Sequence, residues 1–553
     1  MTLRKTTFLL LIWIVGSVMA SNRTKAEMFS LAHDILNGSQ THRAGNTNPM
    51  KVLQQRNMLT VIGHEQEGFV IIANDDKVPA VVGYSQTPFT TFPPALEWYL
   101  DAADKALKYI AANGQRRTAI PPSSEFPSKL DPLVKTRWNQ NKPYNNLCPG
   151  GNGSSSMLYP TGCVATALSQ VMKYHNYPKQ GNGEHQYSFQ PSSGDGRILY
   201  ANFGDTSYDW DNMLDDYSAT AYTEEQANAV ATLMLHCGVS VDMGYTASGS
   251  GAYGQEACLA LKTYFRYNKN TRLYTRNYYS AESWMKMIYQ ELNQYGPIYY
   301  AGVSDGGGGH AFVLDGYDET GFVHINWGWG GKSDGFFDIA LLNPPSYQFS
   351  AQQEMILNMN PDADIPYESQ IVSTDLSFIN TSKSITINGK IYNAAAEVFK
   401  GVIACVLQDM ETGSITVLKK TDEMTIQPIV NGTYWLETFS LPANSLSKVS
   451  PGTYRLYVAS FAAKDIRWQL VRPREGEVSN YIVTISPEGN ITWQTSTDDL
   501  WTIDAPTTIQ APVATQSDAS VRYFDLHGYD VNPSTKGLLI RKQGNEIKKV
   551  IVK

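Results

Sequence analysis

The sequence predicts a multidomain protein of the α+β class whose C-terminal part is all β. Its 553 residues allow three or four domains of about 150 residues each. Helix-like and strand-like apolar patterns are mixed as far as residue 361, whereas short alternating strands separated by turns dominate from residue 362. Charged residues make up 17% and apolar residues 42% of the chain, which is typical of globular and not of disordered proteins.

Composition and apolar pattern also divide the chain along its length. We expect a signal peptide at residues 1–20, a small α+β unit at 21–125, a larger α+β unit at 126–361, a β-sandwich at 362–495, a linker at 496–520 and a terminal segment with a hairpin at 521–553. In the small unit, 69–73 and 78–84 have strand patterns and 96–111 has helical spacing. The segment 113–127 contains Arg116, Arg117 and prolines, and we expect it to be an exposed, cleavable linker.

The first residues predict export. Arg4 and Lys5 precede an apolar run over 8–18, and small residues follow near position 20, as in a secretory signal peptide. An uncleaved anchor is the alternative. No later stretch reaches about 18 uninterrupted apolar residues, so no membrane span is expected after signal removal.

Net charge and cysteine spacing exclude several function classes. The net charge of −8 offers no basic surface for nucleic acid or an anionic membrane. The five cysteines include no CxxC pair, so no structural zinc site is expected, although a disulfide among Cys148, Cys237 and Cys258 stays open. A GxGxxG pattern at 249–254 follows a strand-like stretch at 239–243, but its surroundings lack βαβ alternation. We therefore expect no nucleotide, metal or other cofactor.

Cys163 is the first residue with a chemical signature. It follows a turn at 160–162 and opens a segment with apolar residues at 164, 167, 168, 171 and 172, which is helical spacing. At the first turn of a helix, unpaired N–H groups and the helix dipole favour the nucleophilic thiolate. The alternative is that Cys163 is merely a small buried hydrophobic residue.

His310 and Asn326 complete a recognisable set. His310 follows a glycine run and opens an apolar strand, and Asn326 with Trp327 ends the returning strand of a predicted hairpin. The Asn326 amide oxygen would accept from one ring nitrogen of His310, and Trp327 would cover that hydrogen bond. The alternative for the Trp-Gly run is a hairpin that carries core tryptophans. Gln140, upstream of Cys163, would supply an oxyanion-hole amide together with the Cys163 backbone N–H.

A Cys-His-Asn set is what acyl transfer requires, and its order along the chain is papain-like. Long motifs around these residues resemble the streptopain family of secreted cysteine peptidases, and the layout is most similar to the interpain-type members of Bacteroidetes. The motifs are Gly162–Ala167, Met172–Pro178, Gly309–Gly316 and His324–Gly331, and the resemblance covers residues 21–361.

The resemblance implies a papain-like two-subdomain catalytic domain preceded by an inhibitory propeptide at 21–125. It implies Cys163 as nucleophile, His310 as base, Asn326 and Trp327 as its support, and Gln140 in the oxyanion hole, with His324 only a strand residue. It also implies substrate contacts at Gly251 and Gly309. A serine of the family's loop is Gly251 here, so only backbone contacts are expected from it.

The sequence therefore predicts a secreted cysteine endopeptidase made as a zymogen, acting on host or nutrient proteins through a thiolate–imidazolium pair and a thioacyl intermediate. Its own propeptide would inhibit it, and 521–553 resembles tails recognised by Bacteroidetes secretion machinery, which places the enzyme outside the cell or on its surface. The resemblance also implies a preference for hydrophobic residues just before the residue at the cut bond. The alternatives are a secreted adhesin with an inactive peptidase-like domain, or a transamidase that uses the same acyl-enzyme chemistry.

Overall fold

The computed structural model describes most of the chain. The described residues are 22–38, 49–113, 119–150, 157–191, 196–303, 309–342, 353–361, 368–381, 384–395, 397–428, 435–498, 522–524, 530–532, 534, 536–543 and 546–552. The predicted signal peptide, Arg116–Arg117 and most of the linker at 496–520 lie outside them. The chain forms two compact units, one of residues 1–411 with 415–503 and one of 412–414 with 504–553. The predicted mixture of α and β structure is confirmed.

The N-terminal segment, which we define as residues 22–113, is an antiparallel meander between two helices. Its elements are α1 (Lys25–Gly38), β1 (Lys51–Gln55), β2 (Leu59–His64), β3 (Gly68–Ala73), β4 (Val81–Ser85) and α2 (Pro94–Asn113). Thr24 and Glu27 form a capping box at the start of α1, since each side chain bonds the backbone N–H of the other. Pro94 opens α2, where its missing N–H costs no hydrogen bond.

The region of residues 119–361, which we call the catalytic region after the expectation from the sequence, contains the remaining α-helices that the structure describes. Its elements are α3 (Cys163–His175), β5 (Glu184–Phe189), β6 (Arg197–Asn202), η1 (Trp210–Asn212), α4 (Glu224–Val239), α5 (Gly254–Thr263), β7 (Arg272–Thr275), η2 (Arg276–Tyr278), α6 (Ala281–Gln294), β8 (Ile298–Val303), β9 (Gly309–Tyr317), β10 (Val323–Asn326), β11 (Gly335–Phe337), η3 (Ala340–Leu342) and β12 (Glu354–Leu357). The strand expected at 239–243 is absent because α4 continues to Val239 and turns follow it. This removes the last structural support for a nucleotide site at 249–254.

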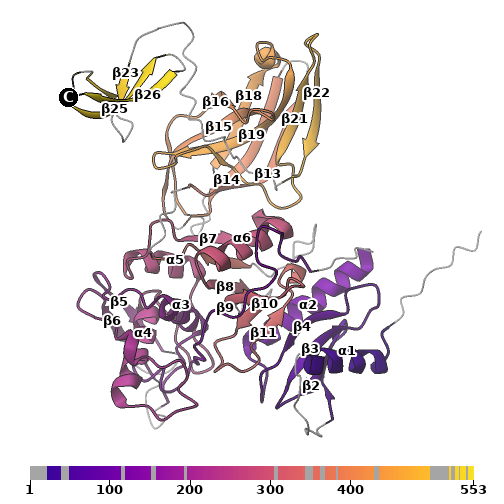
Figure 1. The fold of residues 1–553 in the computed structure, drawn as a ribbon, viewed down its shortest axis with the longest axis vertical. Helices are drawn as coiled ribbons and strands as arrows, with labels where there is room; N and C mark the ends of the chain where they lie inside the picture. Colours follow the sequence, from indigo (N-terminus) through magenta and orange to yellow (C-terminus); the bar gives the residue numbers. More distant parts are fainter. Residues whose placement is uncertain are drawn as a thin grey trace, which may run out of the picture. The chain divides into compact units, whose positions relative to one another are not determined.

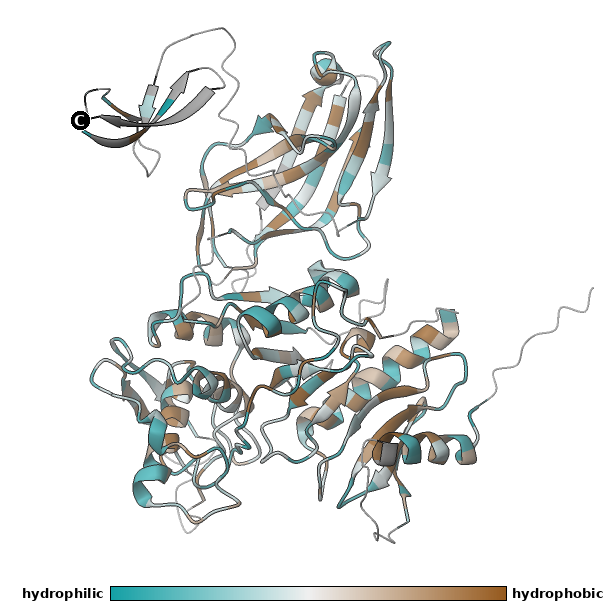
Figure 2. Ribbon diagram, in the orientation of Figure 1, coloured by the Kyte–Doolittle hydropathy of each residue, from teal (hydrophilic) through white to brown (hydrophobic). Residues whose placement is uncertain are grey.

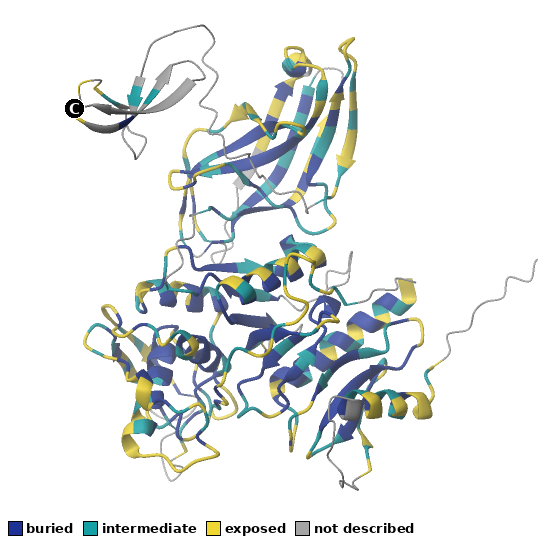
Figure 3. Ribbon diagram, viewed as in Figure 1, coloured by how far each residue is buried: buried dark blue, intermediate teal, exposed yellow. Residues whose placement is uncertain are grey.

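One ten-stranded sheet joins the N-terminal segment to the catalytic region (Figure 1). Its order is β1-β2-β3-β4-β11-β10-β9-β8-β12-β7, and β4 meets β11 through Tyr84↔Phe336 and Gly83↔Phe337. The strands of this sheet carry mostly hydrophobic and mostly buried residues (Figures 2 and 3). A single sheet therefore crosses the boundary between the two parts.

Successive side chains of β9 point to opposite faces of this sheet, where they belong to two different hydrophobic cores. Phe312 and Leu314 belong to a cluster that includes buried residues of α2 and α6, so the N-terminal segment and the catalytic region share this core. Ala311 and Val313 belong to the other cluster, which contains the buried face of α3 with residues of α4 and α5. Helix α3 is thereby fixed against β8 and β9.

Residues 371–496 form two antiparallel sheets around a third core. One sheet has the order β13 (Ile371–Asn380), β14 (Ser384–Asn393) and β18 (Trp435–Pro442). The other contains β15 (Phe399–Asp409), β16 (Ile415–Lys420), β17 (Met424–Ile426), β19 (Gly452–Ala462), β20 (Gln469–Leu470), β21 (Asn480–Ile485) and β22 (Ile491–Ser496), with η5 (Ala443–Leu446) following β18. In the second unit, β23 (Arg522–Phe524), β24 (Asp530–Val531), β25 (Gly537–Gln543) and β26 (Glu546–Val552) form one sheet, and β25 with β26 is the hairpin expected there.

All five cysteines are free thiols, so the disulfide considered among Cys148, Cys237 and Cys258 does not form. Each of the three lies in a different neighbourhood: their Sγ atoms contact Tyr245 Oη at 3.9 Å, Ser169 Oγ at 3.3 Å and Thr271 O at 3.6 Å, respectively. None of the helices that the structure describes has both the length and the hydropathy to cross a bilayer.

Candidate active site

Cys163 is the first residue of α3, as its spacing predicts. Gly162 precedes it with φ +91°, and a Cβ there would lie 2.8 Å from the Ser250 carbonyl oxygen and 2.9 Å from the Met243 sulfur, so this close approach requires glycine. No side chain caps the helix, which leaves its first N–H groups available to the half-buried thiol.

Burial raises the pKa of the Cys163 thiol, and the backbone N–H groups of Ala311 and Val164 lower it by less. The helix start thus acts in the predicted direction, but desolvation outweighs it in this structure. The expectation that the helix start favours the thiolate holds for these N–H groups, whereas burial makes the net pKa of Cys163 higher than that of a free thiol. The influence of Ala311 N–H also places the sulfur beside β9, at the residue that follows His310 in sequence.

His310 lies at the beginning of β9, where it pairs with Gly302 of β8. Burial lowers the pKa of its imidazole. Among the residues that the structure describes, none forms a hydrogen bond or ion pair with the His310 ring. The indole of Trp98 on α2 packs directly against Gly302, so the N-terminal segment reaches the end of the sheet that carries His310.

Asn326 ends β10 but its amide does not meet His310. Its Oδ1 accepts from Gln170 Nε2 at 3.1 Å and from Gly328 N at 3.0 Å, while Nδ2 donates to Thr136 O at 2.9 Å. The expected hydrogen bond from His310 to Asn326 is therefore not present in this structure, because other groups occupy the amide.

Gln170 connects three parts of the site, and the sequence analysis missed it. It is fully buried on α3, and its Oε1 accepts from Thr136 Oγ1 at 2.9 Å and from Trp138 N at 3.5 Å, while its Nε2 donates to Asn326. It thereby joins the nucleophile helix to β10 and to the segment that leads to Gln140. The only available signal was a glutamine between the apolar positions 168 and 171 of the helix.

Trp327 is a core residue at the junction with the N-terminal segment. Its ring lies 5.0 Å from that of Phe312, 5.1 Å from Phe337 and 6.3 Å from Tyr99 of α2. Its backbone N–H donates to Asp334 Oδ1 at 3.0 Å. The interpretation of the Trp-Gly run as a hairpin with core tryptophans thus fits this structure, and Trp327 covers no hydrogen bond of His310 here.

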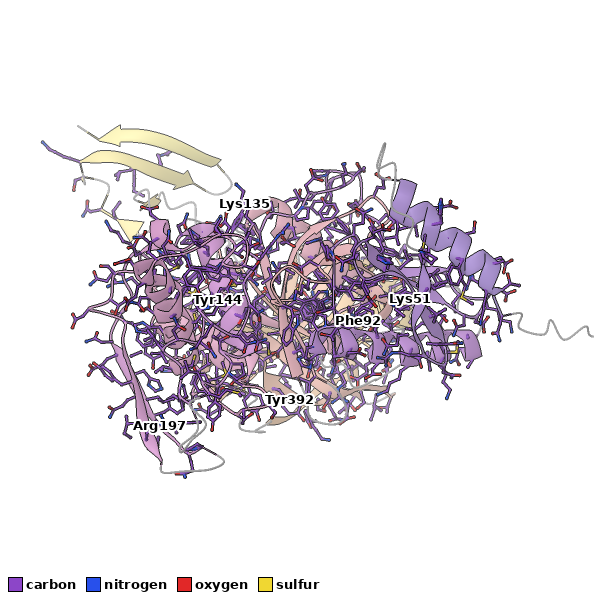
Figure 4. All side chains as sticks on the ribbon, turned by 90° about the horizontal axis from the view of Figure 1, so that it is seen from below. Lys51, Phe92, Lys135, Tyr144, Arg197 and Tyr392 are labelled. Carbon is purple, nitrogen blue, oxygen red and sulfur yellow. The ribbon has the colours of Figure 1, made fainter. Side chains whose placement is uncertain are left out.

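A backbone hydrogen bond holds Gln140 close to the segment that leads to Cys163. Its carbonyl oxygen accepts from Thr161 N at 3.0 Å, two residues before Cys163. Within the described part of the chain, no group hydrogen-bonds to its side-chain amide. The preceding turn is anchored by Trp138, whose ring lies 6.2 Å from that of Tyr144 (labelled in Figure 4). An amide beside the start of α3 is suited to an oxyanion hole.

The two predicted substrate-contact glycines lie on the loop before α5 and at the start of β9. Gly251 is exposed and bridges Gly244, with nothing within 4 Å of a Cβ built there. Ser250 Oγ donates to Pro160 O at 2.7 Å, which holds the 244–251 loop against the turn before Cys163. Gly309 pairs with Val303 at the first position of β9.

A buried acid–histidine cluster supports the hairpin behind the site. His324 Nδ1 lies 2.6 Å from Asp315 Oδ1, and Asp315 Oδ2 accepts from Val134 N at 2.9 Å. Burial raises the pKa of Asp334 to about 7 although His324 lowers it. His324 is thus a strand residue with a structural partner, as expected.

A cysteine that begins a helix, beside a strand whose second residue is a histidine, is the arrangement expected of a cysteine peptidase site, and the comparisons with known proteins agree. The Peptidase C10 family model matches residues 138–337. Streptopain of Streptococcus pyogenes is 35% identical over 318 residues, which cover 53% of this chain and 78% of that protein. The chain belongs to the Peptidase C10 family and is a cysteine-type endopeptidase.

Two further relatives come from other organisms. The thiol protease/hemagglutinin PrtT of Porphyromonas gingivalis is 32% identical over 356 residues, which are 60% of this chain and 39% of that protein. A structure of a mutant prointerpain A fragment from Prevotella intermedia matches with a TM-score of 0.52 at 38% identity. It covers 57% of this chain and all of that chain.

Proposed function

We propose that the chain is a secreted cysteine endopeptidase made as a zymogen. The observation that carries the proposal is the position of the Cys163 sulfur beside Ala311 N–H, one residue from His310. The family membership supports the same chemistry.

In the proposed reaction the Cys163 thiolate attacks the carbonyl carbon of a peptide bond. The oxyanion that forms accepts hydrogen bonds from the Cys163 N–H and the Gln140 amide. Protonated His310 gives its proton to the amine as the C–N bond breaks, which leaves a thioester on Cys163. His310 then takes a proton from water, the hydroxide displaces sulfur, and the carboxylic acid and free enzyme are released.

The N-terminal segment is the proposed inhibitory prosegment. It contributes four strands to the shared sheet, Trp98 packs beside the partner of His310, and Tyr99 contacts Trp327. Burial raises the pKa of Cys163 and lowers that of His310, a combination that disfavours the ion pair. Removal of the segment would hydrate the site and free the histidine.

We also propose where the enzyme acts. The signal peptide would direct export, and the segment 521–553 would engage secretion machinery that delivers the enzyme outside the cell or to its surface. Host or nutrient proteins are the proposed substrates. Gly251 and Gly309 would bind the substrate through their backbone groups, since Gly251 lies on the loop held against the turn before Cys163, Gly309 begins the strand that carries His310, and neither has a side chain.

Active-site labelling tests the proposal. The chain without its N-terminal segment is treated with the epoxide E-64, and the adduct is mapped by mass spectrometry alongside casein cleavage. We expect label on Cys163, and loss of both label and cleavage in Cys163→Ala and of cleavage in His310→Ala. Cys405→Ala, which removes a buried thiol of β15, is the matched control and should behave as wild type.

Three results would reject parts of the proposal. Peptide hydrolysis by Cys163→Ala would exclude the mechanism. Absence of both label and cleavage in the wild type would favour a binding protein with an inactive domain. Products that carry an added amine in place of new carboxyl ends would identify a transamidase.

A further inference from the structure

The proposed mechanism does not use the carboxylate of Glu354, which lies in the same cross-strand row as Ala311 beside the nucleophile. Glu354 of β12 pairs with Ala301 of β8, and Ala301 pairs with Ala311 of β9. Directly paired residues point to the same face of a sheet. Both alanines belong to the core cluster that includes α3 and touches Cys163. Glu354 therefore lies on the nucleophile's face, two strands or about 10 Å from Ala311.

Small residues separate the nucleophile from this carboxylate. Ala311, whose N–H acts on the Cys163 sulfur, and Ala301 present only methyl groups along the row that leads to Glu354. At the end of the row the Glu354 carboxylate packs against Gly254, where any Cβ would overlap it. Gly254 opens α5 shortly after the 244–251 loop, which carries the proposed substrate contact Gly251. The carboxylate thus stands between the sheet and that loop.

The Glu354 carboxylate lacks a cation. No lysine, arginine or histidine among the described residues forms an ion pair with it, and the nearby Lys262 is paired with Glu397. Burial raises the pKa of Glu354 to about 7, although the Gly254 N–H lowers it. Keeping the Glu354 carboxylate ionised in such a buried place costs free energy unless a positively charged group pairs with it.

A second polar group at this place is also without a partner. Tyr299 of β8 is fully buried, and its hydroxyl has no hydrogen-bond partner among the described residues. Burial raises the pKa of Tyr299, and the charges of Glu354 and Cys163 add to the rise. The hydroxyl is therefore within electrostatic range of both the carboxylate and the nucleophile, and it can accept a hydrogen bond from an incoming donor.

We infer that Glu354 determines specificity for the second residue before the cut bond and selects lysine or arginine there, an inference that rests on the proposed function. The carbonyl of the residue at the cut bond must reach Cys163 Sγ, so the preceding residue lies about 3.8 Å farther along the chain, over Ala311 and Ala301. The aliphatic stem of a basic side chain packs on the two methyl groups, and its charged end meets Glu354 and Tyr299. The preference for hydrophobic residues that the family resemblance implies is met by the aliphatic stem of the basic side chain, and it does not explain the selection for the charged end.

The test compares two fluorogenic substrates, Z-Arg-Arg-AMC and Z-Leu-Arg-AMC, which differ only at this residue. The enzyme without its N-terminal segment is titrated with E-64, and the ratio of kcat/KM for the two substrates is measured. We expect the ratio to fall at least about tenfold in Glu354→Gln, which keeps an oxygen for the Gly254 N–H. Glu256→Gln, which removes an exposed charge from the same helix end, should change it by about twofold or less.

The outcomes separate this inference from the proposed function. An unchanged ratio in Glu354→Gln overturns the role of Glu354, whereas no cleavage of either substrate by the wild type overturns the proposed function instead. If Glu354→Gln does not fold, the wild type is used to digest a denatured protein mixture and the cut sites are mapped by mass spectrometry. Enrichment of lysine and arginine two residues before the cut supports the inference, and absence of enrichment refutes it.

Discussion

Replacing Gln170 by methionine should destabilise the catalytic region by about 3 kcal/mol. The two side chains have similar volume, so the change removes hydrogen bonds with little loss of packing. Asn326 Oδ1 loses one of its two donors, and Thr136 Oγ1 loses its acceptor at 2.9 Å. A buried polar group left without its partner costs about 1–3 kcal/mol. The longer contact from Trp138 N, at 3.5 Å, adds little.

Urea denaturation followed by tryptophan fluorescence measures this effect. Both variants are made in the full chain with Cys163→Ala, which prevents self-digestion, and Trp138 and Trp327 report on the affected region. Gln294→Met, at the exposed end of α6, is the control and should stay within about 0.5 kcal/mol of its parent. A loss below about 1 kcal/mol for Gln170→Met would refute the reasoning, because the three segments would then be held together without this amide.

Three other changes test the same structure. Because burial raises the pKa of Cys163, its alkylation by iodoacetamide in the full chain should require higher pH than the alkylation of free cysteine; identical pH profiles by mass spectrometry would contradict this. Trp98→Ala should weaken inhibition of the mature enzyme by the separate N-terminal segment about tenfold or more, and an unchanged inhibition constant would argue against the contact with Gly302. Burial raises the pKa of Glu291 to about 8 in the folded state, whereas the unfolded state releases this proton near pH 4.5. Between these two pH values, the free energy of unfolding falls by about 1.4 kcal/mol for each unit that the pH rises. In Glu291→Gln, the free energy of unfolding measured from pH 5 to 8 should therefore decline less than in the wild type. An equal decline in the two proteins would disprove this prediction.

Local patterns allowed prediction of elements and residue types but not of long-range partners. The helix that begins at Cys163 and the strand at 69–73 follow from apolar spacing and turns within short windows. The hydrogen bond of Asn326 joins residues 156 positions apart and depends on how α3 packs on the sheet, which spacing does not contain. The strand expected at 78–84 begins only at Val81, because Arg23 binds the Val78 carbonyl and holds that stretch in a turn.

The chemistry at the site was also only partly predictable. A helix dipole can be inferred from sequence, whereas the desolvation that outweighs it at Cys163 depends on what covers the thiol. Likewise, a glutamate at position 354 looks like any strand residue until the register with Ala301 and Ala311 is known.

The core shared by the N-terminal segment and the catalytic region has a consequence for maturation. Cutting the linker turns an intramolecular contact into an intermolecular one, which lowers the effective concentration of the segment but leaves every buried side chain of the interface in place. If the segment is the proposed inhibitor, the nicked protein would then be a tight complex of enzyme and inhibitor, and dilution alone would release it slowly. Full activity would then follow destruction of the segment itself, and the first substrate that each enzyme molecule must clear would be its own former domain.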